Sequence, residues 1–112
     1  TSKIKEILAN TVEIKENPHQ PEEFRLNRVY PNPFNPETTI EYELADAGLT
    51  RIDIYDLAGN KVKELLNRRQ QAGQYAATFH ATGMSSGMYI IKLKHVNGTL
   101  HYTATEKCLL LK

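Results

Sequence analysis

From Phe24 to the C-terminus, apolar and polar residues alternate with a period close to two, and turn residues interrupt the alternation about every ten positions. Alternation of this kind places successive side chains on opposite faces of a β-strand. Short strands at regular spacing are typical of a small antiparallel sandwich. The pattern predicts an all-β, immunoglobulin-like antiparallel β-sandwich of about seven strands without a disulfide, with residues 24–29 as a strand at an edge.

Four of the predicted strands have one face of large apolar side chains, and turns or loops join the strands. Gly59-Asn60 and Asn97-Gly98 predict two hairpins, because glycine and asparagine tolerate positive φ. A further strand is predicted over residues 61–66. The predicted inward residues are Ile40, Tyr42 and Leu44 in residues 38–44, Ile52 and Ile54 in residues 51–55, Tyr75, Ala77 and Phe79 in residues 74–80, and Tyr89, Ile91 and Leu93 in residues 88–96.

The size and charge of the chain exclude several classes of function. Its 112 residues suffice for one domain of about 90 residues and a leader, which leaves little room for a large catalytic cleft. A net charge of +1 lacks the long-range field of a nucleic-acid-binding protein. The four histidines have no spacing typical of metal ligands, and neither a metal nor another cofactor is predicted.

The single cysteine, Cys108, cannot form an internal disulfide, so the fold must be stable without one. Its position in the alternation of the last strand predicts a small buried hydrophobic side chain. A buried thiol has a raised pKa and is inert, so a structural role is favoured over a reactive one.

Residues 1–23 differ in composition from the rest of the chain. They are acidic overall, and residues 17–23 contain two prolines and no apolar side chain, which is typical of an extended linker. Residues 4–15 fit either the tail of a preceding domain or an added strand. We divide the chain into residues 1–23, the end of a preceding domain plus a linker, and residues 24–112, the C-terminal domain; a fragment of a longer protein is expected.

A proline-rich segment, residues 30–36, follows the first predicted strand. Its prolines fix φ and keep the preceding residues out of the helical region. Asn32 and Asn35 are expected to bond to the local backbone as turns. Tyr30 and Phe34 are expected to plug one end of the sandwich; a polyproline ligand for another domain is the alternative.

The last strand places the apolar run Cys108 to Leu111 between Lys107 and Lys112. An edge strand has unpaired N–H and C=O groups that another chain can bind. The run therefore fits a strand displayed to a partner, with Leu109 and Leu111 providing specificity, or a core strand with solubilising ends.

A catalytic site is not predicted. Ser85 and Ser86 lie in a glycine-flanked turn, where serine is expected for local hydrogen bonding, and no nucleophile elbow surrounds them. His80, Asp56 and Asp53 would complete a triad only on paper. The domain is expected to be non-catalytic, and an enzyme, if present, would lie upstream.

Five motifs occur in an order that resembles the type IX secretion system C-terminal sorting domain, type A, of the Por secretion tail family. The resemblance extends from about residue 24 to the end of the chain. The motifs are Tyr30-Pro31-Asn32-Pro33-Phe34-Asn35-Pro36 with Thr38-Thr39-Ile40, Ile54-Tyr55-Asp56-Leu57-Ala58-Gly59, Ala72-Gly73-Gln74-Tyr75, Ser86-Gly87-Met88-Tyr89-Ile90, and Lys107 to Lys112.

The resemblance implies a targeting module at the end of a secreted or cell-surface bacterial protein that travels through the periplasm. It implies recognition by an outer-membrane translocon, removal by a surface transpeptidase, and attachment of some cargoes to lipopolysaccharide; the cargo domain would lie N-terminal in the same chain. Nucleic acid is not an expected partner. The implied recognition residues are Gly87, Tyr89, Lys107, Cys108, Leu109, Leu110, Leu111 and Lys112.

Four residues at three places in the chain depart from the family pattern: the dipeptide Phe79-His80, Glu106 and Cys108. The alternative from another class is a structural or adhesive immunoglobulin-like module, similar to the domain of flagellar hook-capping proteins. A carbohydrate-binding module ranks below both, because the chain has no tryptophan and its tyrosines mostly alternate inward.

Overall fold

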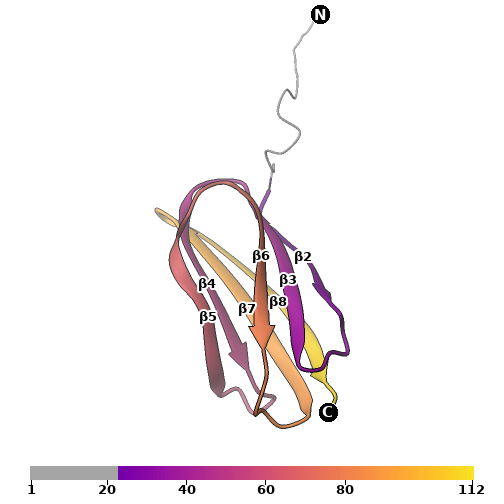
Figure 1. Cartoon of the computed structure of the whole chain (residues 1–112). Coiled ribbons are helices and arrows are strands. Elements are labelled where there is room, and N and C mark those ends of the chain that lie inside the picture. The colour runs from indigo at the N-terminus through magenta and orange to yellow at the C-terminus, as the bar shows by residue number, and fades with distance from the viewer. Residues whose placement is uncertain (1–22) are drawn as a thin grey trace, which may run out of the picture.

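The computed structural model describes residues 23–112, which form seven strands in two antiparallel sheets (Figure 1). The all-β sandwich predicted from the alternation is confirmed, including the edge strand near residues 24–29. The strands are β2 (Arg25–Tyr30), β3 (Glu37–Leu44), β4 (Gly48–Tyr55), β5 (Lys61–Gln70), β6 (Gly73–His80), β7 (Gly87–Asn97) and β8 (Leu100–Leu110).

The two sheets have three and four strands. The first has the order β2-β3-β6, and the second has the order β5-β4-β7-β8. The terminal strand β8 is therefore an edge strand, paired along its length with β7. The proline-rich loop after β2 lies at the same end of the sandwich as the C-terminus, opposite the end at which β2 begins (Figure 1).

The apolar faces of the two sheets form the core, as the alternation predicts. Ile40, Leu44, Ile52, Ile91 and Leu93 are completely buried. Tyr75 and Ala77 were also predicted inward but are only half-buried. They belong to β6, which is an edge strand and has a neighbouring strand, β3, on one side only. Burial of these side chains is the main favourable contribution to folding.

Two strands are longer than the alternation predicts. β4 begins at Gly48 and β5 continues to Gln70, and these two residues are paired in the sheet. Gln70 is 8% exposed, and its side-chain Oε1 accepts a hydrogen bond of 2.8 Å from the Tyr42 hydroxyl. Because Gln70 is a polar residue at an inward position, it breaks the alternation of apolar and polar residues. The alternation therefore did not predict the end of β5.

His95 is a buried residue of β7 that pairs with Thr50 of the neighbouring strand β4. Its ring is completely buried; Nδ1 lies 2.9 Å from the Thr50 hydroxyl, and Nε2 lies 3.0 Å from the Asp46 carbonyl oxygen. Both ring nitrogens thus have partners, as a buried histidine requires. The spacing of the histidines gave no sign of this role, because both partners are distant in sequence.

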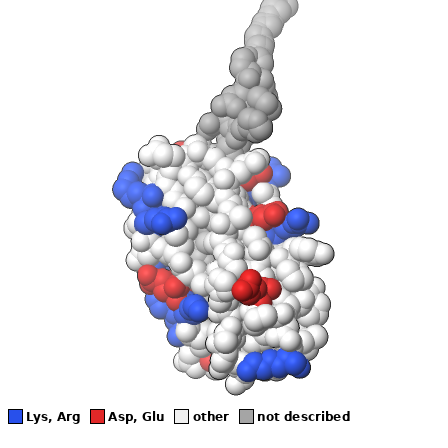
Figure 2. Space-filling model, in the orientation of Figure 1, with Lys and Arg blue, Asp and Glu red and all other residues white. Residues whose placement is uncertain are grey.

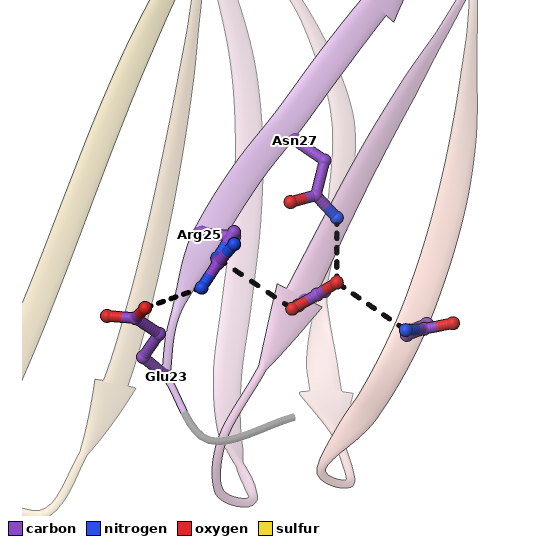
Figure 3. A network of polar contacts seen from close by, with 5 residues as sticks. Glu23, Arg25 and Asn27 are labelled. Atoms are coloured by element: carbon purple, nitrogen blue, oxygen red, sulfur yellow. Dashed lines mark hydrogen bonds and ion pairs between the residues drawn. The ribbon is translucent and has the colours of Figure 1, made fainter. Parts of the chain in front are cut away.

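The beginning of the described chain is joined to the outer face of the three-stranded sheet by polar contacts (Figure 3). Arg25 contacts both Glu23 and Glu43, and the Glu43 carboxylate also accepts hydrogen bonds from Asn27 and Gln74. Because most of these side chains are exposed, their contribution to stability is small.

The predicted leader, residues 1–23, lies outside the described residues except for Glu23. The two alternatives for residues 4–15 lie outside them entirely. Within residues 23–112, no helix has the length and apolarity of a membrane span.

Candidate recognition surface at the end of β8

The structure brings the predicted recognition residues together at one end of β7 and β8. Gly87 pairs with Leu110, and Tyr89 pairs with Cys108, so two segments that are distant in sequence lie side by side. Leu111 and Lys112 directly follow β8, and the Lys112 N–H donates to the Ser86 hydroxyl at 3.1 Å.

Alternation divides these residues into a buried set and an accessible set. Tyr89, Cys108 and Leu110 are at most 8% exposed and pack in the core. Lys107, Leu109 and Leu111 point away from the core; Leu109 is half-buried and Leu111 is 51% exposed. We call these three side chains the recognition face, since a partner can contact them without unfolding the domain.

The outer backbone edge of β8 is covered at this end, so of the two alternatives for the last strand, a bare edge displayed to a partner is wrong here. The Phe34 N–H donates to the Leu109 carbonyl oxygen at 2.9 Å, and the Leu111 N–H donates to the Phe34 carbonyl oxygen at 3.0 Å. The Asn32 side chain adds two bonds: its Nδ2 donates to the Lys107 carbonyl oxygen at 3.1 Å, and its Oδ1 accepts from the Leu109 N–H at 3.0 Å.

We call residues 32–34 the edge cap. On the N-terminal side of Lys107, the outer edge of β8 has no strand partner among residues 23–112. A partner strand could therefore not pair with Leu109 unless the edge cap moved, because the Leu109 N–H and C=O and the Leu111 N–H already have hydrogen bonds.

The proline-rich segment has a different role from the one that its local sequence predicts. Phe34 is 2% exposed and its ring centre lies 5.4 Å from that of Phe79, so its predicted role as a plug is confirmed. Tyr30 is 62% exposed, which makes the same prediction wrong for that residue; the Arg28 guanidinium lies 5.1 Å from the centre of its ring. Asn32 bonds to β8 rather than to the local backbone.

A hollow of about 480 Å³ lies beside the recognition face and is lined by Ile90, Thr105, Glu106 and Lys107. One acidic and one basic residue line it, so the hollow has no net charge of either sign. Positive and negative side chains are interspersed on the face of the molecule shown in Figure 2.

The buried Cys108 thiol has a raised pKa. Burial raises it to about 11, and the nearby Glu106 carboxylate adds to the shift. The thiolate, which is the nucleophilic form, is therefore scarce at neutral pH. The prediction of a buried cysteine without reactive character agrees with this environment.

Alkaline pH is expected to destabilise the fold through Cys108. The thiol loses its proton at about pH 8.5 when the chain is unfolded but only near pH 11 when it is folded. Between these values the unfolded chain binds fewer protons, so the free energy of unfolding falls as pH rises. Urea unfolding should show a steeper loss for the native sequence than for Cys108→Ala. Tyr42, whose pKa burial also raises, titrates in both proteins, so parallel losses would contradict the assignment to Cys108.

The residues considered for catalysis are not assembled into a site. His80 Nδ1 lies 3.0 Å from Glu37, and Asp56 accepts hydrogen bonds from Ala58 and Asn60 in its own turn. Those bonds lower the pKa of the Asp56 carboxyl, the backbone N–H of Asn60 contributing most. In the part of the chain that the structure describes, no hydrogen bond joins a serine to His80, and no cluster of three or more acidic, histidine or cysteine side chains is arranged to bind a metal.

Comparison with known proteins gives one match. A family model described as "Secretion system C-terminal sorting domain" matches residues 28–105. No curated protein and no solved structure matches the chain. The matched range begins within β2, contains β3 to β7 in full together with the edge cap, and stops within β8.

Proposed function

The chain belongs to the family of secretion system C-terminal sorting domains, and we propose that it directs an attached protein across the outer membrane through the type IX secretion system. Family membership makes it the sorting signal of a secreted or cell-surface bacterial protein. In the proposal, residues 24–112 are the sorting domain, and residues 1–23 are the linker and the end of the preceding cargo domain.

The observation that supports this proposal best is the recognition face. Lys107, Leu109 and Leu111 project from a strand whose backbone edge is covered, so a partner can bind their side chains in the folded domain. Exposed apolar side chains next to a hollow are typical of protein interaction sites. The proposed partner is the outer-membrane translocon, and binding uses side-chain contacts rather than strand addition at Leu109 to Lys112.

Processing forms the second part of the proposal. A surface transpeptidase would separate the domain from its cargo after export, and some cargo would be attached to lipopolysaccharide. An upstream cleavage point is compatible with the fold, because the described domain has its own core, from Phe34 to Leu110. A cut before Phe24 would leave this core intact.

Secretion of a fusion protein tests the proposal. The 112-residue chain is fused to a periplasmic reporter in a host with this secretion system, and reporter is measured in the medium and at the cell surface. Leu109→Ser and Leu111→Ser are expected to lower export by about tenfold each, because a central apolar contact typically contributes this much to binding.

Leu100→Ser is the matched control for this experiment. Leu100 begins the same strand, is 52% exposed and lies at the other end of β8 from the recognition face. Its replacement should leave export unchanged. Periplasmic retention of the fusion with the native sequence would contradict a sorting role and favour an adhesive or structural module.

A further inference from the structure

The side chain of Asn32 continues the pairing of Phe34 with β8 as if it were part of a strand. In a parallel pair of strands, a residue bonds to two residues of the opposite strand. Its N–H donates to the C=O of one of them, and its C=O accepts from the N–H of the residue two positions later in that strand. Phe34 does this with Leu109 and Leu111, on either side of Leu110. The Asn32 carboxamide does the same with Lys107 and Leu109, on either side of Cys108.

The chemistry of the side chain explains why asparagine suits this position. A carboxamide has the same donor and acceptor groups as a peptide unit. Asn32 and Phe34 are two residues apart, and so are Cys108 and Leu110, which matches the repeat along one edge of a strand. Two residues thereby satisfy four outward backbone groups of residues 107–111.

The neighbouring contacts hold the edge cap in place. The Thr38 hydroxyl donates to the Pro31 carbonyl oxygen at 2.6 Å on one side of Asn32. On the other side, the buried Phe34 ring packs on Phe79. Asn32 is thus attached to a fixed segment, whereas Leu111 and Lys112 lie beyond the end of β8.

We propose that Asn32 is a positioning residue for the sorting signal: its carboxamide holds Lys107 to Leu111 in strand geometry, so that the recognition face projects from the sheet in one arrangement. The inference rests on the proposed function. Without these bonds the end of β8 would fray, and only the fraction of molecules with an ordered terminus would bind the export machinery.

Hydrogen exchange of the whole 112-residue chain tests the local effect. In Asn32→Ala, the Leu109 amide should exchange about tenfold faster, as expected for the loss of a hydrogen bond. The Leu93 amide, in the middle of the four-stranded sheet, should be unchanged, as should the midpoint of thermal unfolding. Asn32→Leu, which preserves side-chain volume, should behave like Asn32→Ala.

Asn35→Ala is the matched control, because Asn35 is an exposed asparagine of the same proline-rich segment and, within residues 23–112, its side chain makes no hydrogen bond to β8. It should alter neither exchange nor export. In the reporter fusion, Asn32→Ala should lower export at least about twofold, in line with a smaller competent fraction. A merely structural role would move the unfolding midpoint together with the exchange rate.

The outcomes separate this inference from the proposed function. Unchanged exchange at Leu109 in Asn32→Ala would overturn the inference, whatever happens to export. Faster exchange with undiminished export would overturn the role of Asn32 in sorting. Failure of the native sequence to export the reporter would instead overturn the proposed function, and the sorting role of Asn32 with it.

Discussion

Phe34→Ala should lower the free energy of unfolding by about 3–5 kcal/mol, the usual cost of removing a buried aromatic ring. The ring is 2% exposed and packs against Phe79, with the two ring centres 5.4 Å apart. Its loss leaves a cavity in the core beside Phe79 of β6. Because domains are stable by only about 5–15 kcal/mol, this is a large part of the total. The midpoint of urea unfolding, at constant slope, is the measurement.

Tyr30→Ala is the matched control for Phe34, since both aromatics belong to the same segment. Tyr30 is 62% exposed and its main partner is Arg28, so its replacement should change stability by less than about 1 kcal/mol. Equal effects of the two substitutions would contradict the assignment of Phe34 as the plug. Phe34→Leu should be intermediate, because it retains part of the apolar volume.

Gly48→Ala should be the second strongly destabilising substitution, with an expected loss of about 3 kcal/mol or more from overpacking and broken hydrogen bonds. A Cβ at this position would lie 2.3 Å from the Val96 carbonyl oxygen and 2.9 Å from two atoms of the His95 ring. Neither neighbour can move freely, because one is backbone and the other is buried. β4 and β7 would have to separate, which would break the contacts of His95 with Thr50 and Asp46.

Gly59→Ala distinguishes steric crowding from a general effect of replacing glycine. Gly59 has φ +91° and open space around the position of a Cβ, so its cost comes from backbone strain alone, about 1 kcal/mol. Thermal unfolding of the two variants should therefore differ clearly. A loss for Gly48→Ala no larger than for Gly59→Ala would show that β4 and β7 adjust without strain.

The sequence determined the number of strands and most of their buried faces, because each depends on a pattern within a few residues. The alternation of Ile40, Tyr42 and Leu44 predicts which face of β3 is buried, and the structure agrees. Asn97-Gly98 predicts the last hairpin from local backbone preference alone, and Gly98 has φ +62°. The family resemblance likewise depends on short motifs, and the family match agrees with it.

Only the tertiary structure decided how the terminal strand is covered. Asn32 is 75 residues from Lys107 in sequence, and no local pattern indicates that its side chain would bond to β8 instead of its own turn. The same holds for Gln70 with Tyr42 and for Gly48 with His95. Alternation specifies which face of a strand is buried. The segment that pairs with the edge of a strand depends instead on how distant parts of the chain pack. This packing determines which part of the sorting signal is accessible.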